Sequence, residues 1–452
     1  MKTDYFTLLD IFPALLWLII IIIIGYAVRN ANIDKPHYRF YMRNLYAKLF
    51  LSLAFALFYI FIGGGGDTVA YYDSALTLNN LFFKSPSLYF QEMVSEPDMF
   101  RYTASFDTRT GFPPGWIYRE PEAFFVSKLM SLVSFLTLKS YLAMTFIMAF
   151  ITSIASWKLF ELIRNYKMNN EKLLAFGILL MPSVNFWCSG VSKDTVVFIA
   201  VLFLIINAFK ILSIDQKSSL LNYAVVIVCS FIILYVRSFI FIAFIVPFSF
   251  VAISKLVRLA GGGAVTLIIL RVMILGGGII IASGSLISQS EEDFKGSNSL
   301  IQEASNIQQD FNQNKTYGDK KYDLGEIEFS PIGLARVAPL VIITGLFRPF
   351  IWESFSTTLI MNGLESLIFL YFTFLFFRRG FFKKFKQVRN HDFLLFCLMF
   401  TFIIAYMTGL TSILYGVLVR LRAPLLPFLF VLLTVDWNAI KTKKENEIKA
   451  QN

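Results

Sequence analysis

Stretches of about 20 consecutive apolar residues recur along the whole chain, and this repetition limits its possible folds more than any other feature. Each stretch, as a helix, is long enough to cross a hydrocarbon core of roughly 30 Å. Of the 452 residues, 56% are hydrophobic, 50 are Phe and only 16% are charged, whereas a soluble domain carries roughly 25% charged residues. The sequence therefore predicts an all-α polytopic membrane protein.

Lys and Arg residues between these stretches indicate the orientation. They concentrate in residues 29–48, in residues 378–389 and in the tail after Asp436. Cytoplasmic connections of membrane proteins carry an excess of Lys and Arg, so we place all three in the cytoplasm. The net charge of +11 then reflects topology rather than nucleic-acid binding. We expect the N-terminus outside and the C-terminus in the cytoplasm.

About eleven transmembrane helices, in a range of roughly 10 to 13, satisfy this orientation. They are expected at about 8–28, 46–63, 140–162, 173–190, 194–212, 219–236, 239–256, 264–284, 356–377, 392–412 and 423–436.

Two further apolar stretches do not fit as crossings. A span at the first would place the basic loops that follow it outside, and a span at the second would carry an Arg and a Pro. Residues 122–138 repeat Ser127, Ser131 and Ser134 at helical spacing, which predicts an amphipathic helix at the periplasmic interface. Residues 331–347 contain an Arg and a Pro and are expected to be re-entrant or interfacial.

The predicted layout has six parts, with two long outer loops. They are the first two transmembrane helices (1–63), an outer loop with the interfacial helix (64–139), the central transmembrane helices (140–284), an outer cap loop with the re-entrant or interfacial segment (285–355), the last transmembrane helices (356–436) and a cytoplasmic basic tail (437–452). The three cysteines, Cys188, Cys229 and Cys397, lie in or beside apolar stretches without metal-ligand spacing, so we expect no disulfide.

The first outer loop begins with FIGGGGDTVAYYD (61–73), in which four glycines precede two aspartates and two tyrosines. A carboxylate just past a flexible joint, close to the bilayer surface, can reach a hydroxyl of a substrate whose lipid end is still embedded. Asp67 is therefore the candidate general base, and Asp73 and Glu122 are further candidate catalytic carboxylates. The same glycines are also compatible with a simple end to the preceding helix.

Nearly every later outer turn retains a cation, although the positive-inside bias should deplete such turns. Arg is apt for a phosphate-bearing ligand because its planar fork binds two oxygens at once. The candidate diphosphate-binding residues are Lys193, Arg237, Arg348, Arg420 and Arg422. The candidate substrate-binding residues are Tyr71, Tyr72, Trp352 and Glu353.

Each residue also has a simpler interpretation. An outer-boundary Arg can extend to lipid headgroups, and Trp352 and the tyrosines can belong to an interfacial aromatic belt. The gathering of all of them at one face favours a functional site. This scheme requires no metal or other cofactor, although Asp67 with Asp73 or Glu122 is also compatible with a divalent cation.

At these residues the chain resembles the bacterial polysaccharide polymerases (O-antigen, capsule or exopolysaccharide) and related membrane glycosyltransferases of the GT-C kind. The resemblance rests on GGDTVAYYDSA (Gly65 to Ala75), on REPEAFFVSKL (Arg119 to Leu129), and on arginines in later outer loops within FRPFIWE and VRLRAP. It implies an inverting polymerase that joins undecaprenyl-diphosphate-linked repeat units at the outer face of the bacterial inner membrane. It also implies a lipid-linked oligosaccharide as substrate, and a chain-length regulator and a flippase as partners.

The related O-antigen ligases typically rely on an outer-face His, whereas His37 and His391 both fall on predicted cytoplasmic loops. The same placement disfavours an exosortase-like transpeptidase, because no outer-face His would activate Cys188. A transporter or flippase for a lipid-linked or anionic substrate is the alternative function. Arg271, between two glycine triplets inside the 264–284 stretch, favours it, while the concentration of charge at one face favours the enzyme. A structural subunit of an envelope complex is the third hypothesis.

Overall fold

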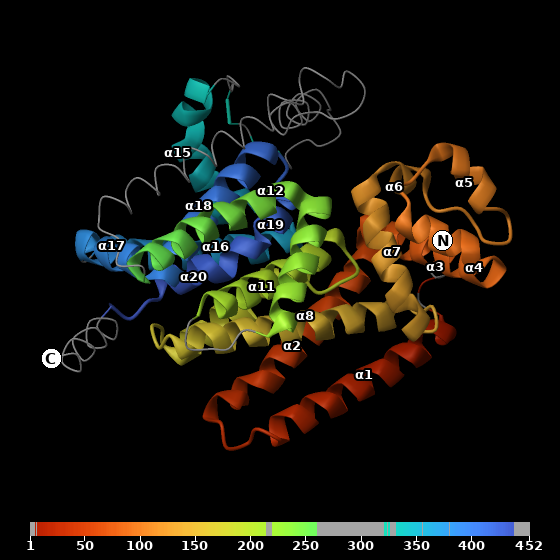
Figure 1. The fold of residues 1–452 in the computed structure, drawn as a ribbon, viewed down its shortest axis with the longest axis horizontal. Helices are drawn as coiled ribbons and strands as arrows, with labels where there is room; N and C mark the ends of the chain where they lie inside the picture. Colours follow the sequence, from red (N-terminus) through yellow and green to blue (C-terminus); the bar gives the residue numbers. More distant parts are fainter. Residues whose placement is uncertain are drawn as a thin grey trace. The chain divides into compact units, whose positions relative to one another are not determined.

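The computed structural model describes residues 5, 7–213, 219–259, 321, 322, 324, 325, 331–354, 356–378 and 380–437. Within these residues the protein is helical throughout, with two isolated bridges and no strand. Eight of the described helices are long and apolar enough to cross a membrane. The predicted all-α polytopic membrane fold is therefore confirmed (Figure 1).

Contacts divide the chain into two compact units, which we describe separately. Unit 1 comprises Met1–Ile163, Ile178–Ile211 and Asp215–Arg237. Unit 2 comprises Arg164–Gly177, Leu212–Ile214 and Ser238–Asn452.

The first part of α12 (Leu220–Leu259), up to Arg237, belongs to unit 1 together with four other long helices. These four are α1 (Leu8–Asn30), α2 (Tyr41–Leu57, continued by the π-helical turn Phe58–Ile62), α8 (Tyr141–Asn165) and α11 (Lys193–Leu212). The start of α1 meets the start of α8, where the Tyr141 amide donates to the Asp10 carboxylate at 2.7 Å. A short 3-10 helix, Pro36–Phe40, joins α1 to α2. The Tyr38 hydroxyl of this helix donates to Glu161 of α8, and further along α2 the side-chain amide of Asn44 donates to the carbonyl of Ser153, so α2 runs antiparallel to α8.

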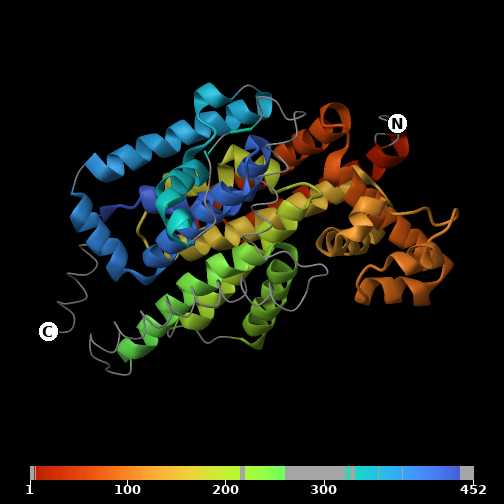
Figure 2. The ribbon, with the colours of Figure 1, turned by 90° about the horizontal axis from the view of Figure 1, so that it is seen from above.

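Five shorter helices follow α2 and gather at the end of unit 1 where α1 begins (Figure 1, Figure 2). They are α3 (Gly66–Lys84), α4 (Pro86–Val94), α5 (Met99–Ser105), α6 (Gly115–Arg119) and α7 (Pro121–Leu136). The region 64–139, expected as a loop with one interfacial helix, is thus largely helical. α7 corresponds to that expected helix.

The serines of α7 are buried together with some of its apolar residues, and other apolar side chains of α7 are exposed. Ser127, Ser131 and Ser134 are completely buried, and Ser131 and Ser134 hydrogen-bond to Asn79 of α3, whereas Leu132 and Leu136 are half exposed. This arrangement suits a helix whose outer side faces lipid while its hydroxyls are satisfied inside the protein.

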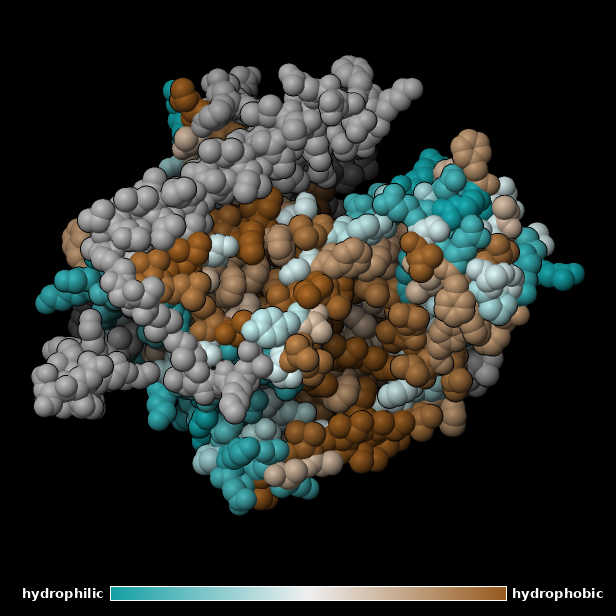
Figure 3. Space-filling view, in the orientation of Figure 1, coloured by the Kyte–Doolittle hydropathy of each residue, from teal (hydrophilic) through white to brown (hydrophobic). Residues whose placement is uncertain are grey.

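The surface of unit 1 has an apolar zone between two polar ends (Figure 3). Polar residues gather over α4–α6 and at the turn between α1 and α2, whereas apolar residues cover the length of α1. Phe12, Ile19 and Ile23 are among the exposed apolar side chains of α1. Exposed apolar side chains over such a length match a bilayer core.

Unit 2 contains the remaining long helices. They are α15 (Pro331–Phe347), α16 (Thr357–Arg378), α17 (Phe381–Asn390), α18 (Asp392–Thr411), α19 (Tyr415–Leu421) and α20 (Leu426–Leu433), with short 3-10 turns at Ile351–Glu353 and Ala423–Leu425. α15 and α18 cross closely at two glycines. Gly345 faces the carbonyl of Ala405, and Gly409 faces the carbonyl of Val341.

The expected crossings at 219–236 and 239–256 appear as one helical segment, α12 (Leu220–Leu259), with non-helical backbone at Arg237. Arg237 contacts Asp194 in the first turn of α11, whereas Lys255 donates to the carbonyl of Leu212 at the last turn of α11. The break at Arg237 divides α12 between the two units.

Two other expected crossings differ. Residues 173–190 are not one helix but three short ones: α9 (Glu171–Ala175), the π-helical turn Phe176–Leu180 and α10 (Pro182–Trp187). Pro182 cannot donate to the preceding turn, which explains the break. The last crossing begins at Tyr415, not at 423. The stretch 264–284, with Arg271, and most of the cap loop 285–330 lie outside the described residues.

Candidate functional site

The four glycines after α2 form a tight reversal. Gly64, Gly65 and Gly66 have φ values of 67°, 91° and 53°, a backbone region that other L-residues adopt at a cost of roughly 1–2 kcal/mol each. A Cβ on Gly66 would also lie 2.9 Å from Cε1 of Tyr59. The chain can therefore end α2 and restart as α3 within four residues. Asp67 lies exposed in the first turn of α3.

α3 separates the predicted residues onto two sides. Asp67 and Tyr71, four positions apart, share one side, because residues at i and i+4 are neighbours on a helix. Burial raises the pKa of the Tyr71 phenol, and the negative charges of Asp67 and Asp194 raise it further. Tyr71 therefore stays a neutral hydrogen-bond donor beside these carboxylates.

Asp73 and Tyr72 face the start of the chain instead. The hydroxyl of Tyr5 donates to Oδ2 of Asp73 at 3.0 Å, and the rings of Tyr5 and Tyr72 meet edge to face. The Tyr72 hydroxyl donates to the carbonyl of Lys139. Burial raises the pKa of the Asp73 carboxyl, and the Tyr5 hydrogen bond opposes that shift. The contacts of Tyr5 hold this residue against α3.

On the Asp67 side, charged residues from four segments of unit 1 gather. We name this group the charge cluster; it consists of Asp67, Glu120, Glu122, Lys193, Asp194 and Arg237. Nζ of Lys193 lies 3.7 Å from Oε1 of Glu122, and Nη2 of Arg237 donates to Oδ1 of Asp194 at 2.7 Å.

Local sequence positions each member of the charge cluster. Glu120 precedes α7, where Pro121 occupies the first helical position at no hydrogen-bond cost. Ser192 begins α11, because its Oγ accepts from the Thr195 amide at 3.1 Å as a helix cap. Arg237 lies at the break in α12.

The charge cluster contains four carboxylates and two cations. Burial raises the pKa of Glu120; the neighbouring Glu122 and Asp67 charges add to this, whereas Lys193 opposes it. Lys193 and Arg237 are each paired with a carboxylate. Among the described residues, Asp67 has no ion pair or hydrogen bond to its side chain. Glu120 is likewise exposed and without such a contact in the described part of the chain, so Asp67 and Glu120 are the two unpaired carboxylates of the cluster, and Asp67 is the one that lies directly after the glycine reversal.

A metal site does not form here in the part of the chain that the structure describes. No three His, Cys, Asp or Glu side chains of the described residues converge as metal ligands. In particular, Asp67 and Asp73 diverge around α3, as their separate contacts show.

The remaining predicted residues belong to unit 2. Nε of Arg348 lies 3.1 Å from Oε1 of Glu353, whose Oε2 accepts from the Phe350 amide at 2.9 Å. The Arg348 guanidinium also lies over the Tyr322 ring, 5.2 Å from its centroid. Trp352 is 64% exposed and stacks on Phe350, which is compatible with an interfacial position as well as with a ligand contact.

Arg422, expected in an outer turn, lies between α19 and the 3-10 turn Ala423–Leu425, within the candidate span Tyr415–Leu433, and is completely buried. Nη1 donates to the carbonyls of Leu346 (3.3 Å) and Arg348 (2.5 Å), and Nη2 donates to Oγ of Ser366. The guanidinium thus donates to carbonyls at the end of α15 that have no hydrogen-bond partner within α15. Arg420, in the last turn of α19, is half-buried.

Sequence reasoning missed Lys48 and Tyr322. Lys48 was counted as a cytoplasmic charge, but it is completely buried in α2 with its ammonium over the Phe198 ring of α11 and without a hydrogen-bond partner. The sequence does carry a signal for the burial of Lys48, because apolar residues follow it directly. Tyr322 gave no signal: it is placed by the bridge between Lys321 and Leu414 and by its own amide, which donates to the Ile413 carbonyl.

Comparisons of this chain with protein-family models, with curated proteins and with solved structures find no match. The site must therefore be interpreted from its own geometry.

Proposed function

We propose that this protein is a membrane glycosyltransferase that polymerises undecaprenyl-diphosphate-linked oligosaccharide repeat units at the outer face of the bacterial inner membrane. The observation that carries the proposal is the exposure of Asp67 and the absence of a partner for its side chain among the described residues. This carboxylate lies in the first turn of a helix that starts directly after a membrane crossing. A lipid-linked substrate presents its sugar at this level.

In the proposed reaction, Asp67 accepts the proton of the attacking sugar hydroxyl. The hydroxyl oxygen bonds to the anomeric carbon of the donor, and the bond from that carbon to the diphosphate breaks. Lys193 and Arg237, the cations of the charge cluster, would balance the leaving diphosphate by exchanging their contacts with Glu122 and Asp194 for phosphate oxygens. Tyr71, kept neutral by its raised pKa, would donate a hydrogen bond to a sugar oxygen.

The test compares strains of the native host that lack the gene and carry wild type, Asp67→Asn or Asp34→Asn on a plasmid. Asp34 is an exposed carboxylate in the turn after α1 and serves as the matched control. We expect Asp67→Asn to reduce polymer formation roughly 10²–10⁴-fold, the usual contribution of a general base, at normal protein level. Single repeat units should accumulate at the outer face. Full activity of Asp67→Asn would refute the proposed role.

Transport is a second candidate, favoured by one specific observation. Lys48 is a buried ammonium inside a crossing, and the backbone from Cys188 to Ser192 is non-helical and buried. Such groups inside a membrane protein often mark a substrate path. A flippase without polymerase activity would leave single repeat units at the cytoplasmic face in the gene-deleted strain, so the same experiment separates the two functions.

A further inference from the structure

The short helix α17 carries an exposed face of mixed aromatic and basic residues. We name it the α17 face; it consists of Phe382, Lys383, Phe385, Lys386 and Arg389. Phe382 is 85% exposed and Phe385 45% exposed, and all three cations are exposed. α17 contains no Asp or Glu, so nothing on the helix itself balances this charge.

Lys384, the fourth cation of α17, has a different role. Its Nζ donates to the carbonyls of Leu375 (3.1 Å) and Phe376 (2.8 Å) in the last turns of α16. A cation at a helix C-terminus satisfies open carbonyls and the helix dipole. Val388, on the same side as Lys384, is buried. One side of α17 therefore holds the protein together, and the α17 face is left free.

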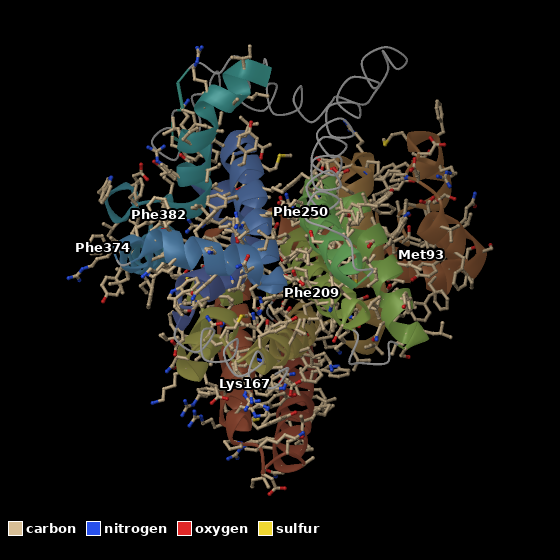
Figure 4. All side chains as sticks on the ribbon, turned by 60° about the vertical axis from the view of Figure 1, so that its left-hand side comes forward. Met93, Lys167, Phe209, Phe250, Phe374 and Phe382 are labelled. Atoms are coloured by element: carbon tan, nitrogen blue, oxygen red, sulfur yellow. The ribbon has the colours of Figure 1, made fainter. Side chains whose placement is uncertain are left out.

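α17 lies at a membrane boundary. It joins two helices that are long and apolar enough to cross, one ending at Arg378 and the next beginning at Asp392. The Phe377 ring stacks on Phe381 at 4.9 Å. Exposed aromatic side chains thus continue from the last turns of α16 onto α17, as Phe374 and Phe382 illustrate at the edge of unit 2 (Figure 4).

We propose that the α17 face binds the headgroups of anionic phospholipids in the membrane that surrounds the protein. A short helix with aromatic and basic residues on its free face lies in the interfacial plane, with rings among the upper acyl chains and cations at the phosphates. The net charge of its free face complements anionic lipid and not a zwitterionic one. This inference does not depend on the proposed catalytic function.

The test uses the purified full-length protein with a fluorophore attached through Asn390→Cys, at the end of α17. Cys188, Cys229 and Cys397 are buried, so the new thiol should react selectively. The protein, in mixed micelles, is titrated with nitroxide-labelled phosphatidylglycerol or with phosphatidylcholine carrying the same label. We expect phosphatidylglycerol to quench at a lower mole fraction, with a preference of roughly fivefold per exposed cation.

Lys383→Gln/Lys386→Gln should reduce this preference roughly twenty-fivefold, whereas the control Arg109→Gln/Arg119→Gln, two exposed cations of unit 1, should leave it unchanged. Phe382→Ser/Phe385→Ser should reduce quenching by both lipids. Equal quenching of the wild type by both lipids would overturn the proposal. So would loss of the preference on adding inorganic phosphate, relative to chloride of equal ionic strength, because the site would then bind a soluble anion. A preference that persists in the double Lys variant would place the lipid elsewhere.

Discussion

At the scale of single residues, Asp67 and Asp73 show how one helix gives two carboxylates different surroundings. Asp67 is exposed and belongs to the charge cluster, whereas Asp73 is half-buried and accepts a hydrogen bond from Tyr5. The two residues have the same chemistry and the same helix. Their different neighbours decide which of them is available to a substrate, so substitution of each should have a different consequence.

We predict that Asp73→Asn keeps the protein folded and removes a pH dependence of its stability. Burial raises the pKa of Asp73 in the folded state, so the folded protein holds this proton to higher pH than the unfolded chain does. The contribution of Asp73 to stability is therefore complete below its ordinary pKa and is lost as pH rises through the raised value. Asn keeps an oxygen that can accept from Tyr5 but carries no charge.

Thermal unfolding of the detergent-solubilised protein across this acidic range measures the effect. Asp73→Asn should be at least as stable as wild type at neutral pH, with a flatter profile, and Asp34→Asn should follow wild type. A large loss of stability at neutral pH would mean that the fold needs the charged form of Asp73.

The basic connections predict that Asp67 and Asp73 lie at the outer face, and this placement stays a prediction. The sequence did not distinguish the surroundings of these two aspartates, because residues 64–84 were expected to form a loop, in which helical spacing does not apply. The buried side of α3 is rich in Thr, Ser and Asn. Of these, Asn79 hydrogen-bonds to serines of α7, Thr68 bonds to the Tyr141 hydroxyl, and Ser74 and Thr77 bond to carbonyls of α3 itself. Such a polar face is not recognised from the sequence as the packed side of a helix until its partner helix is known. Lys48 was misassigned for a similar reason, since its cover, Phe198, lies 150 residues away in the sequence.

At the scale of elements, the glycine reversal sets where α3 begins. Gly64→Ala and Gly66→Ala both place Ala at positive φ, but only the second adds a Cβ beside Tyr59; around Gly64 nothing lies within 4 Å. We predict a loss of roughly 1 kcal/mol for Gly64→Ala and roughly 3 kcal/mol for Gly66→Ala. Thermal unfolding measures both, and equal losses would show that the Tyr59 contact is unimportant.

The α15–α18 crossing gives a second prediction. A Cβ at Gly345 or at Gly409 would overlap a carbonyl oxygen of the facing helix, whereas one at Gly416 of α19 would meet nothing. Gly345→Ala and Gly409→Ala should each destabilise the protein by roughly 1–3 kcal/mol, while Gly416→Ala should be neutral or stabilise it by up to about 1 kcal/mol. Unfolding of the three variants by heat in one detergent tests this, and a tolerated Gly345→Ala would argue against close packing of α15 on α18.

Apolar length predicted most crossing helices correctly, because a bilayer requires about 20 apolar residues and satisfied backbone groups. It failed at 173–190, where Pro182 interrupts the helix and the side-chain amide of Asn185 donates to the Leu179 carbonyl across the break. It also placed the start of the last crossing too late, because two arginines made residues 415–422 look like a turn. Arg422 is tolerated there since its donors reach carbonyls of α15.

At the scale of the whole molecule, the positive-inside pattern predicts that the α5–α6 connection and α17 lie on opposite sides of the membrane. The native cysteines are buried, so Arg109→Cys and Asn390→Cys can report the sides without a cysteine-free background. A membrane-impermeant maleimide should label Arg109→Cys in intact cells, and Asn390→Cys only after permeabilisation. Labelling of both in intact cells would refute the predicted orientation.

The buried ammonium of Lys48 constrains the order in which the protein assembles. When α2 enters the bilayer from the ribosome, the residues that will cover Lys48 have not yet been synthesised. At that stage its long side chain can extend towards the basic residues that precede it and act as a topogenic signal. Only after α11 inserts does Phe198 cover it. We therefore predict that Lys48 first helps to set the direction in which α2 inserts and is later covered in the packed protein.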